Sequence, residues 1–196
     1  MTHVGRTRVK KKKAFFVNVP GYSEQVEFCV LIYFAYPVEN SNEEIVVATI
    51  RLETMLGDTA VVVHPDDAHY KHLHGKYVQH RFLSRHLPIL TDTMVDPTFG
   101  SGAVKVTSAH DPNDFECGCR LSLDFITCIT DDGLMTSECG PYGGKPRFLV
   151  RRQLLEDLKE RSLYRDKKEN EMILSICSRG EGVDDLKSSL NHFKSP

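Results

Sequence analysis

GSGAVKVTSAHDPND, residues 100–114, is the stretch of the sequence that decides the fold. Its two glycines open a strand and allow another backbone segment to approach closely. The strand is predicted over residues 103–107, and it carries Lys105 and Thr107 on one face because side chains alternate along a strand. The stretch therefore predicts a strand that presents two polar side chains together at its end.

A capped helix is predicted directly after this strand. Asp111 is a typical N-cap residue, a proline follows at the first helical position, and Asp114 is an acid in the first turn. The helix should begin there and run toward Arg120. Two interpretations of the acids are open. In the structural one, Asp111 only caps the helix and Asp114 only complements its dipole. In the functional one, Asp114 holds an ammonium group at the polar end of the strand.

A second polar cluster lies in VATIRLETMLGD, residues 47–58. A β-branched strand at 45–50 leads there into one or two turns of helix. Thr49, Arg51 and Thr54 gather at this junction, where the free amides of a helix start can bind an anion or a carbonyl oxygen. Threonine and arginine are common near strand ends, so the cluster alone does not specify a function.

The rest of the chain predicts an α+β fold. Further short strands are expected at 26–36, 59–64 and 125–130, and an amphipathic helix is expected at about 148–163. Short strands at this spacing are typical of a barrel-like, mostly antiparallel sheet with peripheral helices, rather than of regular βαβ units.

Composition places the chain among globular proteins. It has 196 residues, 40% of them hydrophobic, and 25 basic against 27 acidic residues give a net charge of −2. A basic tail is predicted at 1–19 and a loose tail at 180–196. The basic tail is either solvated or a sequence-independent phosphate contact. We find no signal peptide and no apolar run of membrane-spanning length, so no membrane partner is predicted and the cytoplasm is the expected compartment.

The cysteines and histidines do not predict a metal site. One C-x-C pair lacks the usual zinc-knuckle spacing, so all six cysteines are interpreted as reduced thiols: Cys29, Cys117, Cys119, Cys128, Cys139 and Cys177. Five histidines between residues 64 and 80 match no familiar ligand pattern and are interpreted as solvated loop residues: His64, His69, His72, His74 and His80. We therefore expect neither a metal nor a cofactor.

The two polar motifs carry a family resemblance. VATIRLETMLGD and GSGAVKVTSAHDPNDFE resemble the pocket-forming motifs of the inserted editing domain in class I aminoacyl-tRNA synthetases for valine, isoleucine and leucine. AVVVHPDD, HGK and LPIL between them, and PRF…VRRQLLEDLKERSLYR…CSR after them, resemble the same domain in order and spacing. The resemblance covers residues 20–179, which are predicted to be the editing domain. Lys105, followed by Val-Thr and Ala-His-Asp, is similar to the valine enzymes, whereas the isoleucine enzymes have histidine there.

The resemblance implies roles for individual residues. Asp114 would hold the α-ammonium group of the substrate, while Lys105, Arg51 and the threonines would bind its hydroxyl, its carbonyl and the terminal adenosine. The predicted catalytic residues are Lys105, Asp111 and Asp114. The predicted substrate-binding residues are Thr49, Arg51, Thr54, Thr107 and Asp114.

The implied function is post-transfer editing, that is, hydrolysis of threonine wrongly esterified to the 3′ end of tRNA(Val). As is known for this enzyme type, a synthetic pocket shaped for valine cannot strongly reject isosteric threonine, so a second, polar pocket is needed. We see no Ser–His–Asp or Cys–His arrangement, so attack by a positioned water is expected, with the RNA's terminal hydroxyl assisting proton transfer. His110 is either a base or a structural residue. Without ATP-binding motifs, aminoacylation by this chain alone is not expected.

Two other functions stay open at this point. The chain could be a degenerate module that binds tRNA or a partner synthetase without hydrolysis. It could also be a metal-dependent hydrolase that uses the histidine cluster. The oligomeric state is not predicted.

Overall fold

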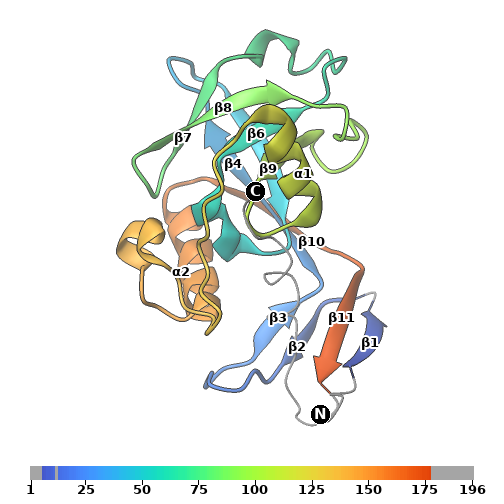
Figure 1. Ribbon diagram of the computed structural model, residues 1–196, viewed down its shortest axis with the longest axis vertical. Coiled ribbons are helices and arrows are strands. Elements are labelled where there is room, and N and C mark those ends of the chain that lie inside the picture. The colour runs from blue at the N-terminus through green and yellow to red at the C-terminus, as the bar shows by residue number, and fades with distance from the viewer. Residues whose placement is uncertain (1–5, 12, 178–196) are drawn as a thin grey trace.

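In the computed structural model, residues 6–11 and 13–177 are described, and they form four small sheets flanked by two α-helices (Figure 1). The sheet orders are β1-β11, β2-β3, β10-β4-β5 and β7-β8-β6-β9. The strands are β1 (Arg6–Lys11), β2 (Phe15–Val17), β3 (Val26–Phe28), β4 (Val30–Pro37), β5 (Glu44–Thr49), β6 (Ala60–Val63), β7 (Tyr77–His80), β8 (Arg85–Thr91), β9 (Ala103–Val106), β10 (Tyr164–Glu169) and β11 (Met172–Cys177). Among these strands only the β6–β8 pair is parallel. The predicted α+β class is confirmed, although the described sheets stay separate and do not close into one barrel.

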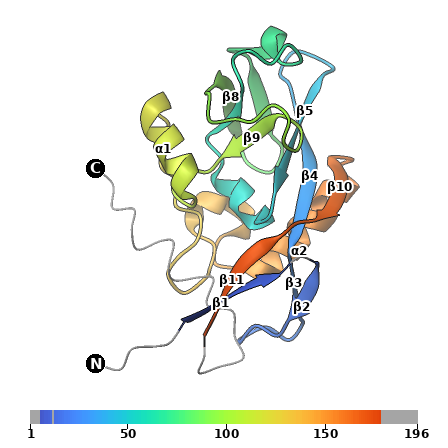
Figure 2. The same cartoon turned by 90° about the vertical axis from the view of Figure 1, so that its right-hand side faces the viewer.

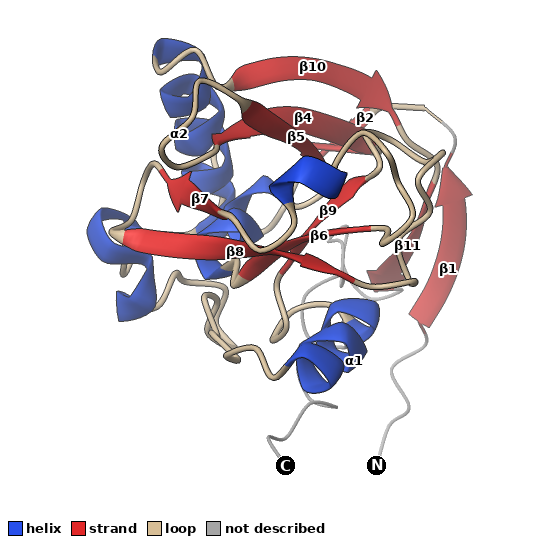
Figure 3. Cartoon of the chain, turned by 90° about the horizontal axis from the view of Figure 1, so that it is seen from above, coloured by secondary structure: helices blue, strands red, loops and turns tan. Residues whose placement is uncertain are grey.

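The helices cover opposite sides of the β6-containing sheet. The α-helices are α1 (Pro112–Leu121) and α2 (Arg147–Glu160), and three short 3-10 helices lie at η1 (Leu52–Gly57), η2 (Lys71–Leu73) and η3 (Ser137–Tyr142). Seen from above, α2 and α1 lie far apart with the strands between them (Figure 3). The sheets therefore occupy the middle layer of this part of the molecule.

Strand β6 is apolar at every position because both of its faces are buried. Val61 and Val63 belong to the main core, together with residues of β4, β5, β8, η1 and α2. Ala60 and Val62 point to the other face, where they pack with Cys117 of α1. A strand buried on both faces needs an unbroken apolar run rather than an alternating one.

The predicted helix after residue 111 is confirmed with its cap. Asp111 Oδ1 accepts hydrogen bonds from the backbone N–H groups of Asn113 (2.8 Å) and Asp114 (3.3 Å). At the other end, Ser122 has a left-handed conformation with φ of 53°. The second predicted helix also forms and ends at Glu160, three residues earlier than expected.

Three predicted elements differ in the structure. The expected strand 26–36 is divided at Cys29, whose φ of 62° turns the chain so that β3 pairs with β2 while β4 pairs with β5 and β10. The prediction of a strand at 125–130 is wrong. This segment is not a strand and makes only an isolated β-bridge, between Ile129 and Met135. The short helix near residue 52 is a 3-10 helix.

Gly57 ends η1 at a point of close packing. A Cβ atom at this position would lie 3.1 Å from Cys128 Sγ and 3.2 Å from Thr107 Cγ2. The glycine is therefore needed because two other segments approach the helix end closely, in addition to its effect on helix termination.

The first and last described strands pair with each other. Six residues of β1 lie antiparallel to β11, from Arg6 opposite Cys177 to Lys11 opposite Met172 (Figure 2). β1 thus falls within the segment predicted as a basic tail, whereas the predicted tail at 180–196 lies outside the described residues. The domain boundaries stay a prediction. No helix in the described part of the chain is long and apolar enough to cross a membrane.

Candidate active site

A cavity of about 370 Å³ lies where β5, η1, β9 and α1 meet, and we call it the strand-end pocket. All seven residues singled out from the sequence line it: Thr49, Arg51, Thr54, Lys105, Thr107, Asp111 and Asp114. Apolar side chains, including Leu31, Met94 and Phe99, complete the wall. The fold therefore brings together the two motifs, which lie about fifty residues apart in the chain.

Lys105 is buried, and the protein uses all of its hydrogen-bonding capacity. Its Nζ donates to Thr107 Oγ1 (2.7 Å), Asp58 Oδ1 (2.9 Å) and Thr54 Oγ1 (3.2 Å). An ammonium group carries three N–H bonds and no lone pair, so none is left for a ligand in this arrangement. Lys105 therefore acts on the pocket by orienting its neighbours.

Asp58 is the residue that the sequence analysis missed. Its side chain is fully buried, and its Oδ1 accepts from both Lys105 and the Thr107 hydroxyl, the latter at 2.6 Å. Its Oδ2 accepts from the Tyr36 hydroxyl at 2.8 Å. Burial, reinforced by the Asp58 charge, raises the pKa of Tyr36 well above its ordinary value, so this phenol stays a donor. The sequence carries no local signal for this role, because Asp58 follows the end of η1 and is separated by Thr59 from the apolar strand β6.

Two threonine hydroxyls face the pocket as acceptors. Thr54 Oγ1 donates its proton to the Arg51 carbonyl at 2.9 Å, and Thr107 Oγ1 donates its proton to Asp58. Each also accepts one bond from Lys105. Because a hydroxyl has one proton and two lone pairs, each retains one free lone pair and no free proton.

Asp114 is a half-buried carboxylate with one uncommitted oxygen. Its Oδ2 accepts from the Thr107 backbone N–H at 2.8 Å, whereas its Oδ1 accepts no hydrogen bond from any described residue. Burial raises the pKa of Asp114 to about 6, against the opposing effects of the Lys105 charge and the backbone hydrogen bond. A cationic ligand at Oδ1 would favour the ionised form. Asp111, by contrast, is exposed and its Oδ1 is engaged in capping α1.

Arg51 and Thr49 supply donors on the wall formed by the end of β5 and the start of η1. Arg51 Nη1 donates to the His110 carbonyl at 3.2 Å, and its other guanidinium N–H groups donate to no described residue. Thr49 Oγ1 accepts the Arg51 backbone N–H at 3.1 Å, while its hydroxyl proton has no acceptor within the described chain. This wall can donate to a carbonyl oxygen or to a ribose hydroxyl.

His110 is placed as a structural residue. Its Nε2 accepts the Cys128 backbone N–H at 2.8 Å, which engages the lone pair that a base would use. Burial, with the charges of Arg51 and Lys105, lowers the pKa of His110 to about 3. The imidazole is therefore neutral and already hydrogen-bonded at physiological pH.

A buried ion pair lies behind the pocket. Glu53 on η1 accepts from Arg151 of α2 through both carboxylate oxygens, at 2.6 and 2.8 Å. Burial opposes ionisation of Glu53, but the charge and hydrogen bonds of Arg151 outweigh it and lower the pKa of Glu53 to about 2. This pair ties η1 to α2.

The histidines and cysteines assemble no metal site in the described part of the chain, where no three His, Cys, Asp or Glu side chains are grouped to hold an ion. His69 is 90% exposed, in keeping with a loop residue. The interpretation of His80 as solvated is wrong, because it is buried and its Nε2 lies 2.9 Å from the Met55 carbonyl. Five of the six cysteines are reduced thiols without a disulfide bond, and the side chain of Cys177 is not among those described.

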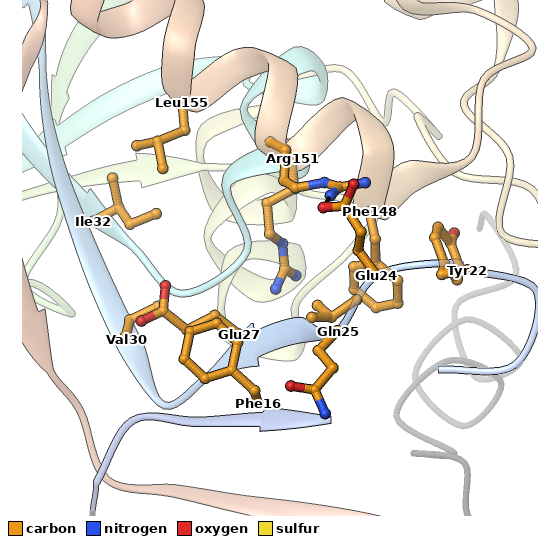
Figure 4. Close-up of a pocket in the computed structure, with 12 residues that line it drawn as sticks. Phe16, Tyr22, Glu24, Gln25, Glu27, Val30, Ile32, Phe148, Arg151 and Leu155 are labelled. Atoms are coloured by element: carbon orange, nitrogen blue, oxygen red, sulfur yellow. Dashed lines mark ion pairs between the residues drawn. The ribbon is translucent and has the colours of Figure 1, made fainter. Parts of the chain in front are cut away.

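A second, smaller cavity of about 150 Å³ lies beside α2 and contains none of the predicted site residues (Figure 4). Phe16, Tyr22 and Phe148 give it aromatic walls, and Glu24 pairs with Arg152 at its rim. Its two carboxylates, Glu24 and Glu27, are paired with Arg152 and Lys167. The candidate chemistry is therefore assigned to the strand-end pocket, where Asp114 has an uncommitted oxygen.

Comparisons with known proteins identify relatives over most of this chain. The chain is 55% identical over 174 residues to a mitochondrial valine–tRNA ligase of Saccharomyces cerevisiae, which covers 88% of this chain and 16% of that protein. It is 52% identical over 169 residues to valine–tRNA ligase of Homo sapiens, covering 85% and 13%. The chain therefore spans about one sixth or less of the length of these relatives. No protein-family model matches it. Because a mitochondrial protein is among the relatives, the expected cytoplasmic location stays a prediction.

Solved structures show the same fold at low sequence identity. One is the LeuRS–tRNA–LeuAMS ternary complex of Agrobacterium radiobacter K84 agnB2, with a TM-score of 0.54 and 18% identity over 88% of this chain and 22% of that chain. Another is GlLeuRS-CP1, with a TM-score of 0.53 and 11% identity over 71% of this chain and 99% of that chain. The second match covers nearly an entire CP1 domain, so the architecture is that of a class I synthetase editing domain.

Proposed function

The chain belongs to the valyl-tRNA synthetase family over the inserted segment that it spans, and on this premise we propose that its strand-end pocket hydrolyses threonine wrongly esterified to the 3′ end of tRNA(Val). The observation that carries the proposal is the orientation of the hydrogen bonds in the pocket. Lys105 fixes the hydroxyls of Thr54 and Thr107 so that each offers a lone pair, and Asp114 offers a free carboxylate oxygen.

The free acceptors provide a physical basis for selecting threonine over valine. A threonine side chain has a hydroxyl proton that can be donated to Thr54 or Thr107, whereas the valine side chain has none. Valine in the same place would desolvate these acceptors without a replacement, at a cost of about 1–3 kcal/mol for each unpaired group. The editing pocket would thus make the opposite choice from a pocket shaped for valine.

Asp114 suits the second feature of the substrate, its α-ammonium group. An ion pair with Asp114 Oδ1 would be a charge-assisted hydrogen bond in a half-buried place, where such bonds are stronger than on the surface. The nearby Lys105 charge would not prevent this, because Asp58 neutralises it at 2.9 Å.

The donors at the junction of β5 and η1 suit the ester carbonyl. In the proposed reaction a water attacks the carbonyl carbon, the carbonyl oxygen gains negative charge, and the free N–H groups of Arg51 stabilise it. The ester C–O bond then breaks, the ribose oxygen takes a proton, and free threonine leaves. His110 is not available as the base, so the adjacent ribose hydroxyl is the proposed route for the proton from water.

The test is deacylation of Thr-tRNA(Val) and Val-tRNA(Val) by the full chain. We expect selective loss of the threonyl ester and its abolition by Asp114→Ala. Glu53→Gln is the control, because Glu53 is also a carboxylate removed from bulk solvent, on the neighbouring η1, but it does not line the pocket. If the chain binds both RNAs and hydrolyses neither, the pocket is a degenerate binding module and the proposal fails.

A further inference from the structure

We propose that Asp58 is a positioning residue that sets the selectivity of the strand-end pocket, by holding Lys105 and Thr107 in the orientation that accepts a substrate hydroxyl. This inference rests on the proposed editing function. It concerns a residue that lies behind the pocket and does not line it.

Asp58 joins three parts of the fold at one carboxylate. It follows η1, it accepts from Tyr36 of β4 through Oδ2, and it accepts through Oδ1 from Lys105 of β9 and from Thr107 just beyond β9. The three contacts are between 2.6 and 2.9 Å, and the Asp58 side chain is fully buried. With three donors already around it, this carboxylate is fixed in place independently of any ligand.

The contact with Thr107 determines which way that hydroxyl points. Asp58 Oδ1 takes the Thr107 proton at 2.6 Å, so the lone pair of Thr107, and not its proton, faces the cavity. Without the carboxylate, the Thr107 hydroxyl could rotate and offer its proton to the pocket. An acceptor for the substrate hydroxyl would then become a donor.

The contact with Lys105 controls the charge of the pocket. Lys105 is only 6% exposed, and Asp58 is the carboxylate bonded to it among the described residues. A buried ammonium without its counter-ion would move toward the cavity, where Asp114 is the next carboxylate, and it would compete there with the α-ammonium of the substrate. Asp58 therefore keeps Asp114 free for the ligand.

Asp58→Asn tests the inference, because it keeps the shape of the side chain and removes its charge. The readout is the ratio of kcat/KM for threonyl over valyl ester, measured beside the thermal unfolding midpoint. We expect this ratio to fall about tenfold or more, because a neutral amide oxygen holds Lys105 and Thr107 less strongly than the carboxylate does and leaves the Lys105 charge uncompensated. Glu53→Gln, the control of equal burial on the neighbouring helix, should lower the midpoint without changing the ratio. A folded Asp58→Asn variant with an unchanged ratio would overturn the inference.

Two further measurements keep the inference testable if one variant is unstable or if no ester is hydrolysed. In the double variant Asp58→Asn/Lys105→Met both charges are removed, and its ratio should still lie below that of Lys105→Met alone, because Asp58 also orients Thr107 through a contact that does not involve Lys105. Separately, the Lys105 ammonium protons should give a slowly exchanging NMR signal in the wild type and in Glu53→Gln, and lose it in Asp58→Asn. Absence of ester hydrolysis in the wild type refutes the proposed function. If the wild type shows no protected Lys105 ammonium signal, Asp58 does not hold Lys105 in place and the inference fails.

Discussion

Asp114→Asn should stabilise the free protein while it abolishes deacylation, because the ionised Asp114 is unfavourable until a cation reaches it. The folded-state pKa of about 6 exceeds the ordinary 3.8. At about 1.36 kcal/mol per pH unit, this difference corresponds to about 3 kcal/mol. Solvent reaches part of the side chain, so about 1–2 kcal/mol is the expected net effect.

The sign of the pH dependence follows from the direction of the shift. Between pH 4 and 6 the folded state binds a proton at Asp114 that the unfolded state has released, so the wild type loses stability as pH rises through this window. Asp114→Asn carries no titrating group here and lacks this contribution. The two proteins should therefore differ little near pH 3.5 and most above pH 7.

Urea unfolding at a series of pH values measures this directly. At pH 7.5 we expect the variant to be more stable by about 1–2 kcal/mol. In thermal unfolding, this corresponds to a midpoint higher by about 2–8 °C for a chain of this size. The amide oxygen can still accept the Thr107 backbone N–H, so the fold around α1 should persist. The assignment of Asp114 as an acid with a raised pKa predicts that the stability difference between variant and wild type grows from pH 4 to pH 7.5. A difference that stays constant over this range, or that shrinks, would refute it.

Three other predictions follow from the site. Arg151→Met leaves Glu53 as a buried, unpaired charge and should destabilise the chain by about 3–5 kcal/mol in urea unfolding without changing ester selectivity, whereas Arg152→Met breaks only an exposed pair and should cost less than about 1 kcal/mol. His110→Gln should keep the pH profile of deacylation, and a loss of about 10² or more in kcat would instead identify His110 as a general base. Prolonged dialysis against a chelator should leave the rate of ester hydrolysis unchanged, and recovery of a lost rate by added zinc would contradict this.

Most residues of the candidate site could be predicted from the sequence, because they fall in two short motifs. The spacing that places Lys105 and Thr107 on one side of the chain, and the cap at Asp111, are local patterns that the structure confirms, although the strand ends at Val106, one residue before Thr107. The meeting of these residues with Thr49, Arg51 and Thr54 in one cavity is not local. It was expected only through the family resemblance, because β5 and β9 belong to different sheets, and neither motif by itself indicates how the two sheets pack together.

The features that were missed depend on tertiary packing. Asp58 could not be distinguished from a turn acid, since its burial results from Tyr36 and Lys105 converging on it from two other strands. The break at Cys29 was hidden in a continuous apolar run, because a left-handed backbone at a non-glycine residue has no compositional signal. His80 lay within a histidine-rich loop segment, yet it belongs to β7 and is buried against η1.

The central claim is that the strand-end pocket recognises threonine through its hydroxyl and its α-ammonium group. The most direct test is NMR titration of the full chain with two hydrolysis-resistant ligands, 3′-amino-3′-deoxyadenosine acylated with threonine or with valine. We predict that the threonyl ligand binds at least about tenfold more tightly, as expected for one satisfied buried hydrogen bond, with shift changes centred on Thr54, Thr107 and Asp114. Equal affinities for the two ligands, or shift changes confined to the aromatic cavity beside α2, would contradict the account.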